Sequence, residues 1–295
     1  MNPGQFTSVA SSATTQQDRA PTERAGRALT IRRRSGVSVA AMGDVVHCSV
    51  DRGVATITLD SPTNRNALSR QLVGELNTAL DRAEQPDVRA VILTHTAPVF
   101  CSGADLKERV SGTADAQAAG NPMADAIDRL GSMRAVTIAA VDGPVRAGGI
   151  GLMASCDLVV VNRRVSFALT EVRIGVAPAI ISVPILARCG WSKLAAPFLT
   201  GEPFDAEAAR DMGLVTHVTD DVPATVAGLV QGVLAGAPGA VAVAKRLLRR
   251  PSTDMAEMTA LSESLFRSEE GIEGMRAFAE KRPPSWARAV ESKGA

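Results

Sequence analysis

Asp142-Gly-Pro-Val-Arg-Ala-Gly-Gly-Ile-Gly151 is the stretch around which the predicted fold is organised, together with the earlier stretch Val99-Phe-Cys-Ser-Gly-Ala-Asp105. Both place small residues where a predicted strand ends, and sequence that can start a helix follows each of them. Backbone N–H groups at such places are unpaired, and glycine lets a ligand approach them closely because it has no Cβ. Two such N–H groups aimed at one point form an oxyanion hole. Glycine-rich turns of this kind are common, so each stretch alone is weak evidence for an oxyanion hole. The two stretches together are more specific evidence.

The sequence around the two stretches alternates between strand and helix patterns. Two β-rich runs, Val45–Val50 and Val54–Leu59, are separated by the turn sequence Asp51-Arg-Gly53. Ser69 is placed to cap a helix with an apolar face. Further strands are expected at 89–94, 136–141, 157–161 and 165–168, and further helices at 123–133, 206–212 and 222–235. The β-α-β-α-β order predicts a parallel, right-handed α/β fold.

The composition is that of a globular protein without the charge of a nucleic-acid binder. Hydrophobic residues make up 45% of the 295 residues, which is ample for a buried core. The formal net charge is +1, and aromatic residues make up 3% with no tyrosine, which leaves little for phosphate binding or base stacking. Asp142 and Arg146 interrupt the longest apolar run, so no run reaches the length of a membrane span. We therefore expect a soluble protein, with neither nucleic acid nor a membrane as a partner.

The cysteines and histidines show no metal-ligand spacing. The four cysteines lie far apart in apolar or small-residue settings, and the three histidines are scattered. They are Cys48, Cys101, Cys156, Cys189, His47, His95 and His217. This pattern predicts reduced core thiols in a cytoplasmic protein and no metal site.

Residues 1–41 differ in composition from the rest of the chain. Ser, Thr, Gln and Arg dominate, and hydrophobic periodicity is absent. The segment contains six arginines but only two acidic residues. We interpret the segment as disordered. An Arg-rich, acid-poor start fits a mitochondrial transit peptide, or a start codon placed too far upstream with Met42 as the true initiator. The lack of tyrosine and the abundance of Ala, Val and Arg are typical of a high-GC bacterium, so we favour the second interpretation.

At its two glycine-containing stretches the sequence resembles the crotonase superfamily, which comprises the enoyl-CoA hydratases and isomerases. The family pattern Phe-x-x-Gly-Ala-Asp is matched by Phe100–Asp105, which implies that the Ala104 N–H is one oxyanion donor. The second family segment is matched by Gly143–Gly149, which implies that the Gly148 N–H is the other. In the family these groups hold the thioester oxygen of an acyl-CoA. The interaction strengthens as the thioester becomes an enolate, so it favours the transition state.

The resemblance runs from about Val45 to Trp286 and implies the crotonase fold, an α/β fold in which ββα turns form a spiral core and a helical C-terminal region follows. We assign residues 42–235 to the core, with the oxyanion hole and the CoA site, and residues 236–295 to the helical region. The stretch Glu273–Pro283 resembles the closing signature of the family, whose helix often reaches a neighbouring subunit. A homotrimer, or a dimer of trimers, is therefore implied.

The catalytic carboxylates depart from the family pattern at one of two positions. The family uses two glutamates to handle one water molecule; the first position is Gly151 here, and the second is kept as Glu171. Leu169, Val172 and Ile174 flank Glu171, so partial desolvation should disfavour its charged form, which suits a proton shuttle. We expect Glu171 to be the single catalytic carboxylate. The alternative is an ordinary surface carboxylate.

One carboxylate leaves three functions open: hydration of a 2-enoyl-CoA, isomerisation of a double bond by one base, and thioester binding without catalysis. Covalent catalysis is disfavoured because Ala179 stands where dehalogenating and dienoyl-isomerising members place an aspartate. The residues around the site resemble a bacterial subgroup associated with methylglutaconyl-CoA hydration in leucine breakdown. We therefore expect an enoyl-CoA hydratase, with 3-methylglutaconyl-CoA as a candidate substrate. No cofactor is expected, since CoA is part of the substrate.

CoA recognition is implied by a third stretch, Pro62–Leu68, which resembles the CoA-binding loop of the family. Arg65 would approach phosphate or ribose, the Ala67 backbone would approach the pantetheine or adenine end, and Lys107 is a second candidate phosphate contact. Each cation could equally be a solvated surface residue. The remaining residues implied to border the substrate are Ser102, Ala104, Asp105, Leu106, Arg146 and Gly148.

Two residues of the second stretch suggest how the acyl chain is selected. Gly151 leaves space and no charge where a glutamate would otherwise face the water, and we expect that space to take a methyl branch or a water molecule. Arg146 stands where an apolar residue is usual, and an arginine can bind a distal carboxylate bidentately. We therefore predict that Arg146 selects an acidic acyl chain. The alternative is that it points to solvent or pairs with Asp142 or Glu171.

Overall fold

The computed structural model describes residues 43–96, 98–111 and 120–287. The chain divides into two compact units after Met42, and only the second unit, Gly43–Ala295, contains described residues. The predictions for residues 1–41, including the transit peptide and the alternative start at Met42, lie outside the described residues.

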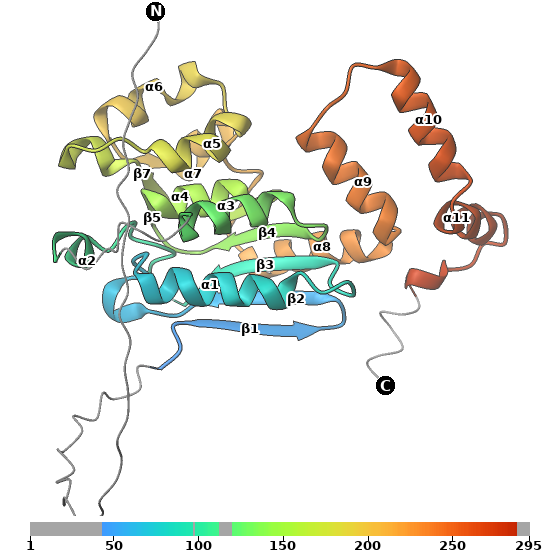
Figure 1. Cartoon of the computed structure of the whole chain (residues 1–295), viewed down its shortest axis with the longest axis horizontal. Coiled ribbons are helices and arrows are strands. Elements are labelled where there is room, and N and C mark those ends of the chain that lie inside the picture. Colours follow the sequence, from blue (N-terminus) through green and yellow to red (C-terminus); the bar gives the residue numbers. More distant parts are fainter. Residues whose placement is uncertain (1–42, 97, 112–119, 288–295) are drawn as a thin grey trace, which may run out of the picture. The chain divides into compact units, whose positions relative to one another are not determined.

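The main sheet has six strands in the order β1-β2-β3-β4-β6-β9. The first four of them, β1 to β4, are labelled in Figure 1. The six strands are β1 (Val46–Asp51), β2 (Val54–Leu59), β3 (Ala90–His95), β4 (Val136–Val141), β6 (Leu158–Asn162) and β9 (His217–Thr219). The first two pair antiparallel across the predicted turn, and all other neighbours in this sheet are parallel. The predicted parallel α/β arrangement is confirmed. Strand β9 is not among the predicted strands.

The helices begin and end close to the expected limits where the sequence predicted them. They are α1 (Arg70–Ala83), α2 (Leu106–Val110), α3 (Pro122–Ser132), α4 (Gly148–Ser155), α5 (Ala179–Arg188), α6 (Trp191–Thr200), α7 (Ala206–Met212), α8 (Val222–Ala235), α9 (Pro238–Arg249), α10 (Met255–Phe266) and α11 (Glu269–Ala279), with short 3-10 helices η1 (Pro62–Asn64) and η2 (Thr170–Ile174). Ser69 caps α1 as predicted, because its side chain accepts a hydrogen bond from the Leu72 N–H.

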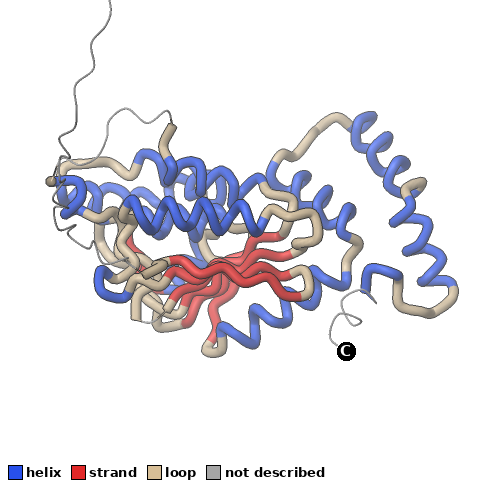
Figure 2. Tube along the Cα trace, turned by 60° about the horizontal axis from the view of Figure 1, so that its bottom comes forward, coloured by secondary structure: helices blue, strands red, loops and turns tan. Residues whose placement is uncertain are grey.

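Two hydrophobic layers cover the two faces of the main sheet. Ile138 and Ala140 of β4 pack with Val222 and Val226 of α8, whereas alternate residues of the same strand join the larger core that includes residues of α1, α3 and α4. Figure 2 shows the strands between helices on both sides. Burial on both faces explains why β4 is a continuous apolar run.

A second sheet of three strands, in the order β5-β7-β8, lies outside the main sheet. Its strands are β5 (Val145–Arg146), β7 (Ser166–Ala168) and β8 (Phe204–Asp205). The strand predicted at 165–168 is β7, and it belongs here rather than beside β6. The chain turns after β6, where the Val165 N–H donates to the Asn162 carbonyl, and Phe167 then stacks on Phe204 with ring centroids 5.4 Å apart.

Helices α9, α10 and α11 form the helical C-terminal region. The Lys245 ammonium of α9 lies 2.8 Å from the Asp157 carboxylate beside β6, and Arg249 binds the same carboxylate. The Glu270 carboxylate of α11 accepts from the Gly239 N–H at the start of α9. Several apolar side chains of this region are exposed, namely Leu248, Met255, Phe266, Ile272, Met275 and Phe278.

Within the described part of the chain, no single helix combines the length and the apolarity that a membrane span requires. Helices α8 and α9 meet both limits only when they are taken together, and they are bent by 113° where they meet.

Candidate active site

The two glycine-containing stretches follow neighbouring parallel strands, β3 and β4, and the structure brings them together. We name residues 99–105 the first segment and residues 142–149 the second segment. Two backbone hydrogen bonds of 3.1 Å and 2.9 Å join them, and the first of these runs from the Phe100 N–H to the Pro144 carbonyl. The carboxyl ends of adjacent parallel strands meet at one edge of the sheet, which is why the segments converge.

Glycine is required where the segments touch. A Cβ added to Gly103, whose φ is 93°, would lie 2.8 Å from the Ala147 Cβ. A Cβ added to Gly149 would lie 2.6 Å from the Cys101 Cβ. Either contact would push the segments apart, since real Cβ atoms do not approach so closely.

Ala147 holds an unusual backbone conformation, with φ 48° and ψ −121°, directly before α4. Such a conformation costs about 1–3 kcal/mol and persists only where the surroundings impose it. The Ala147 N–H donates to the Ala168 carbonyl of β7 (3.0 Å), and the next residue, Gly148, begins α4. The backbone conformation of Ala147 therefore sets the direction in which α4 begins, and with it the direction of the Gly148 N–H.

The N–H groups of Ala104 and Gly148 have no hydrogen-bond acceptor among the described residues. Ala104 is exposed and Gly148 is half-buried, so a ligand can reach both. The Gly148 N–H also lies at the positive end of the α4 dipole, which favours negative charge. The sequence resemblance assigns the role of oxyanion donor to these two N–H groups, and that role stays a prediction.

Glu171 lies in η2, just after the strand that bonds to Ala147. Its Oε2 atom is buried and has no hydrogen-bond partner among the described residues. Desolvation raises the pKa of the Glu171 carboxyl above its ordinary value, and a backbone hydrogen bond opposes this shift. The direction is the predicted one. A buried carboxylate oxygen without a partner is costly for stability and is typical of a group reserved for a substrate.

Gly151 does not leave an open space, contrary to the expectation from the sequence. A Cβ at this position would lie 2.3 Å from the Ile181 Cγ2 of α5, and Ile181 is only 5% exposed. The volume that was assigned to a methyl branch or a water molecule is filled by this side chain. The sequence could not show this, because Ile181 reaches α4 only through the packing of α5 on α4.

Arg146 is half-buried, and its guanidinium donates to the Ser166 carbonyl (2.6 Å) and to the Ser166 Oγ (3.0 Å) of β7. Desolvation lowers the pKa of Arg146. Neither of the predicted partner carboxylates binds it in the described structure; Asp142 instead pairs with Arg164 at 3.1 Å.

The predicted CoA loop lies against the first segment. The Ser102 N–H donates to the Arg65 carbonyl (3.1 Å), and the Leu68 N–H donates to the Gly103 carbonyl (2.8 Å). The Arg65 side chain is exposed, as is Lys107 at the start of α2. Ala67 is buried and Leu106 is half exposed, whereas the Asp105 carboxylate caps α2 by accepting from the Lys107 and Glu108 N–H groups. Asp105 therefore has a structural role that the sequence prediction missed.

Asn66 joins the CoA loop to the first segment, and the sequence reasoning did not single it out. The Ser61 N–H donates to the Asn66 Oδ1 (2.6 Å), and the Asn66 Nδ2 donates to the Val99 carbonyl (2.9 Å). Asn66 is 1% exposed and has a φ of 53°, which asparagine tolerates better than other residues with a Cβ. The sequence feature that could have identified Asn66 is its position directly after Asn64-Arg65, where a turn is expected, because asparagine is common in turns.

We predict that Asn66→Ala lowers the free energy of unfolding by about 2–4 kcal/mol, because it removes the partner of the buried Ser61 N–H and of the partly buried Val99 carbonyl and places alanine at positive φ. Urea denaturation would measure the change. Asn66→Gly is the matched control, since glycine relieves the backbone strain but not the lost bonds, and it should recover about 1 kcal/mol. Equal stability of Asn66→Ala and the unmodified protein would contradict the role of this residue.

Other chemistry is not supported near the site. Burial raises the pKa of the Cys101 thiol to about 12, so it is not a nucleophile. In residues 43–96, 98–111 and 120–287 no three His, Cys, Asp or Glu side chains come together as a metal site would require.

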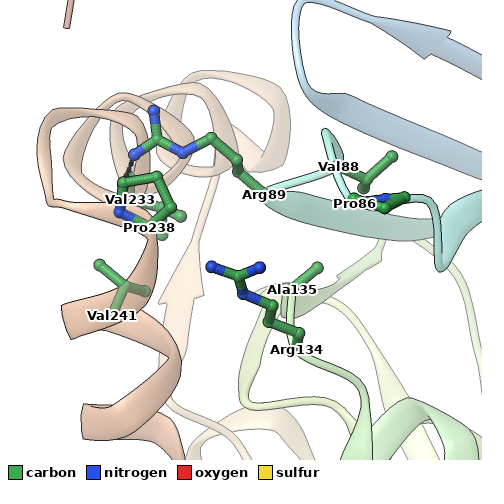
Figure 3. A pocket seen from close by; sticks show the side chains of 8 residues that line it. All are labelled: Pro86, Val88, Arg89, Arg134, Ala135, Val233, Pro238 and Val241. Carbon is green, nitrogen blue, oxygen red and sulfur yellow. Dashed lines mark hydrogen bonds between the residues drawn. The ribbon is translucent and has the colours of Figure 1, made fainter. Parts of the chain in front are cut away.

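A small cavity lies away from these segments, between the start of β3 and helices α8 and α9. Figure 3 shows the guanidinium groups of Arg89 and Arg134 at its edge. Arg89 donates to the Val233 carbonyl (3.2 Å) and to the Gly236 carbonyl, and so holds the end of α8. At about 20 Å³ the cavity is large enough for one water molecule but not for an acyl chain.

The fold and the site together define an α/β enzyme that can stabilise an oxyanion, since two converging segments present free amides and β7 leads directly to a desolvated carboxylate. Residues 49–289 match the protein family described as enoyl-CoA hydratase/isomerase, and this chain belongs to that family.

Similar proteins agree with this assignment. Enoyl-CoA hydratase EchA19 of Mycobacterium tuberculosis is 33% identical over 243 residues, which cover 78% of this chain and 91% of that protein. The crystal structure of an enoyl-CoA hydratase from Mycobacterium avium is 40% identical with a TM-score of 0.62, and the match covers 83% of this chain and 100% of that one. An enoyl-CoA hydratase/isomerase from Marinobacter aquaeolei reaches a TM-score of 0.75 at 28% identity, with the same coverage. The predicted crotonase fold is thereby confirmed.

Proposed function

We propose that this chain adds water to the double bond of a 2-enoyl-CoA, with Glu171 as the only catalytic carboxylate. The observation that carries the proposal is the Glu171 carboxylate itself, which is partly desolvated and has a buried oxygen without a partner in the described structure. The strand before it is bonded to Ala147, directly before the Gly148 donor. Crotonase-family enzymes act on acyl-CoA substrates, and the free amides fit a thioester oxygen.

The proposed reaction needs one base and two donors. The thioester oxygen accepts hydrogen bonds from the Ala104 and Gly148 N–H groups, which draws electron density from the double bond. Glu171 takes a proton from water while the water oxygen bonds to C3, and the electron pair of the double bond passes into the thioester as an enolate. The protonated Glu171 then returns the proton to C2. One water molecule has been added, and the carboxylate is restored.

Isomerisation of a 3-enoyl-CoA is the second candidate, and the packing at Gly151 favours it. Ile181 fills the position from which a second carboxylate could act on water. Isomerisation needs a single base that removes a proton from C2 and returns it to C4, so it needs no water. Binding of a thioester without turnover is the third candidate.

The experiment that separates the three is incubation of the purified protein with crotonyl-CoA, 3-methylglutaconyl-CoA and a 3-enoyl-CoA, followed by mass spectrometry. A mass gain of one water from either 2-enoyl substrate supports the hydratase. An isobaric product from the 3-enoyl substrate alone supports the isomerase. Binding of all three without a product, in a folded protein, supports the non-catalytic function.

We further propose that the substrate is an acidic acyl-CoA such as 3-methylglutaconyl-CoA and that Arg146 selects it. The subgroup resemblance supports this, as does a half-buried guanidinium beside the second segment. We expect Arg146→Met to lower the specificity constant for 3-methylglutaconyl-CoA at least about tenfold more than that for crotonyl-CoA, because a lost charged hydrogen bond is worth about 1.5–3 kcal/mol.

Steady-state kinetics with both substrates would test this. Ser166→Ala is the matched control, because it loosens the tether of the guanidinium without removing the charge. An equal loss for both substrates with Arg146→Met would mean that Arg146 only braces β5 against β7.

We also propose that the chain forms a homotrimer, or a dimer of trimers. Exposed apolar side chains support this proposal, because such side chains are typical of surfaces that contact another subunit. They lie on α5 and α6, among them Val183, Trp191 and Leu199, and on α10 and α11. Analytical ultracentrifugation would test this, and a monomer at micromolar concentration would contradict it.

A further inference from the structure

His95 ends β3, and its ring lies between the two segments that form the site. The Asp142 N–H at the start of the second segment donates to the His95 Nε2 (3.0 Å), and the His95 Nδ1 lies 2.9 Å from the Thr96 carbonyl. The ring also meets Phe100 of the first segment edge-on, with centroids 5.4 Å apart at 79°. One side chain therefore contacts both segments.

The partners of the ring determine its protonation state. A backbone N–H can only donate, so the Nε2 atom must be an unprotonated acceptor; a carbonyl can only accept, so the Nδ1 atom must carry the proton. The neutral tautomer with a proton on Nδ1 is the only form that makes both bonds. Protonation of Nε2 would break the bond to Asp142 and place two hydrogens against each other.

The second segment packs closely on this ring. A Cβ added to Gly143 would lie 3.1 Å from the His95 Cε1 and 2.5 Å from the Pro98 carbonyl oxygen. The bond from Asp142 ties the second segment to the end of β3. It is followed by the bonds from the Phe100 N–H to the Pro144 carbonyl (3.1 Å) and from the Arg146 N–H to the Cys101 carbonyl (2.9 Å). These bonds follow one another along the second segment, which continues to Ala147 and Gly148, whose N–H is the proposed donor.

We propose that neutral His95 is a positioning residue that aligns the two segments, and thereby their free N–H groups, for the proposed reaction. The inference rests on the proposed function, because the geometry it maintains is that of the oxyanion donors. His95 acts through the second segment and not on the substrate.

The surroundings allow this tie to respond to pH. His95 and Asp142 line a groove of about 490 Å³ between the main sheet and α8, and the residues of α8 that line it are all apolar. Among the described residues, the charged groups linked to the ring's bonding partners are the Asp142 carboxylate, the Arg164 guanidinium that pairs with it, and the Asp60 carboxylate, which accepts from the Thr96 hydroxyl. Burial lowers the pKa of His95, against smaller effects of Thr96, Asp142 and Val99 that raise it.

The sign of the pH effect follows from that direction. Because the pKa of His95 is lower in the folded protein than in the unfolded chain, folding favours the neutral ring. The stability that the neutral ring contributes is fully present above the pKa of the unfolded chain, about 6.5, and is lost as the pH falls through the lower pKa of the folded protein. Alignment should therefore fail on the acid side of neutrality.

Two variants test the proposal. His95→Leu removes the acceptor, and we expect kcat for crotonyl-CoA to fall roughly ten- to a hundredfold while KM changes less than about threefold. His95→Gln can still accept from the Asp142 N–H but does not titrate. It should recover most of kcat at neutral pH and should lack the acid ionisation that His95 contributes to the pH profile of the unmodified protein.

Two readouts do not depend on turnover. Nitrogen-15 NMR of the ring should report a proton on Nδ1 at neutral pH. Acetoacetyl-CoA ionises to an enolate that absorbs in the near ultraviolet, and aligned donors should raise the bound enolate fraction in the unmodified protein and in His95→Gln, but not in His95→Leu. If the unmodified protein converts no enoyl-CoA, the proposed function fails, and these two readouts still judge His95.

The proposal is overturned if a folded His95→Leu protein keeps the kcat and the bound enolate fraction of the unmodified protein, or if the ring carries its proton on Nε2. Where His95→Leu does not fold, the NMR result and the pH profile of His95→Gln decide. If the acid limb of the pH–rate profile is the same in His95→Gln as in the unmodified protein, the proposed pH response of His95 is wrong.

Discussion

Glu171→Gln is expected to remove nearly all turnover, by at least about a hundredfold, while affinity for the CoA thioester is retained. Glutamine keeps the size of the side chain and part of its hydrogen bonding but cannot accept a proton, and both proposed reactions depend on this single base. The measurements are kcat with the active substrate and the dissociation constant of the thioester by calorimetry.

Glu202→Gln is the matched control, because Glu202 is an exposed glutamate outside the proposed site. It should leave kcat unchanged. A Glu171→Gln protein that keeps more than about a tenth of the rate would show that another group is the base.

The raised pKa of Glu171 also predicts two pH effects. The base form requires a pH above the raised value, so the acid limb of kcat/KM should lie above the value of about 4.3 for an exposed glutamate. Because the folded pKa exceeds the unfolded one, folding favours the protonated carboxyl, and that contribution is lost as the pH rises through the folded pKa. Glu171→Gln should therefore raise the unfolding temperature at pH 8, and the gain should shrink as the pH is lowered.

Gly148→Pro is expected to lower kcat by about a hundredfold or more, with a smaller loss of acyl-CoA binding. Proline removes the N–H that we assign to the oxyanion hole, and such donors are worth about that much in other enzymes. Proline is tolerated at the first position of a helix, but it disfavours the strained conformation of the preceding Ala147, so the turn should shift as well. Turnover and thioester affinity would be measured separately.

Gly148→Ala is the control that keeps the N–H. The added Cβ would meet the Leu68 Cδ1 at 2.5 Å, which is the end of a flexible side chain that can move aside. We expect a smaller loss of kcat than with proline. Turnover of a folded Gly148→Pro protein at the unmodified rate would exclude the Gly148 N–H as a donor.

The fold was largely predictable because its main signals are local. Apolar runs mark β3, β4 and β6, and Ser69 marks the start of α1. The α/β order then predicts parallel strands. The second sheet was not predictable, because β5 and β8 are two residues long and are stabilised by pairing across the chain rather than by their own pattern.

The meeting of the two segments was predictable where a motif fixes the backbone. Gly103 and Gly149 are needed for contacts that no other residue permits, and so the segments around Ala104 and Gly148 could be found from sequence. The role of Asn66 was not visible, since its partners are brought to it by the fold.

The sequence by itself determined which backbone turns meet at the edge of the sheet and that Glu171 is flanked by apolar residues, because glycine content, capping and hydrophobic period act over a few neighbouring residues. Only the tertiary structure decided what fills the space beside those turns. Ile181 occupies the volume next to Gly151, Ser166 holds Arg146, and His95 joins β3 to the second segment. Each of these contacts joins residues on different elements, and such contacts follow from close packing of the folded chain, to which no local pattern corresponds.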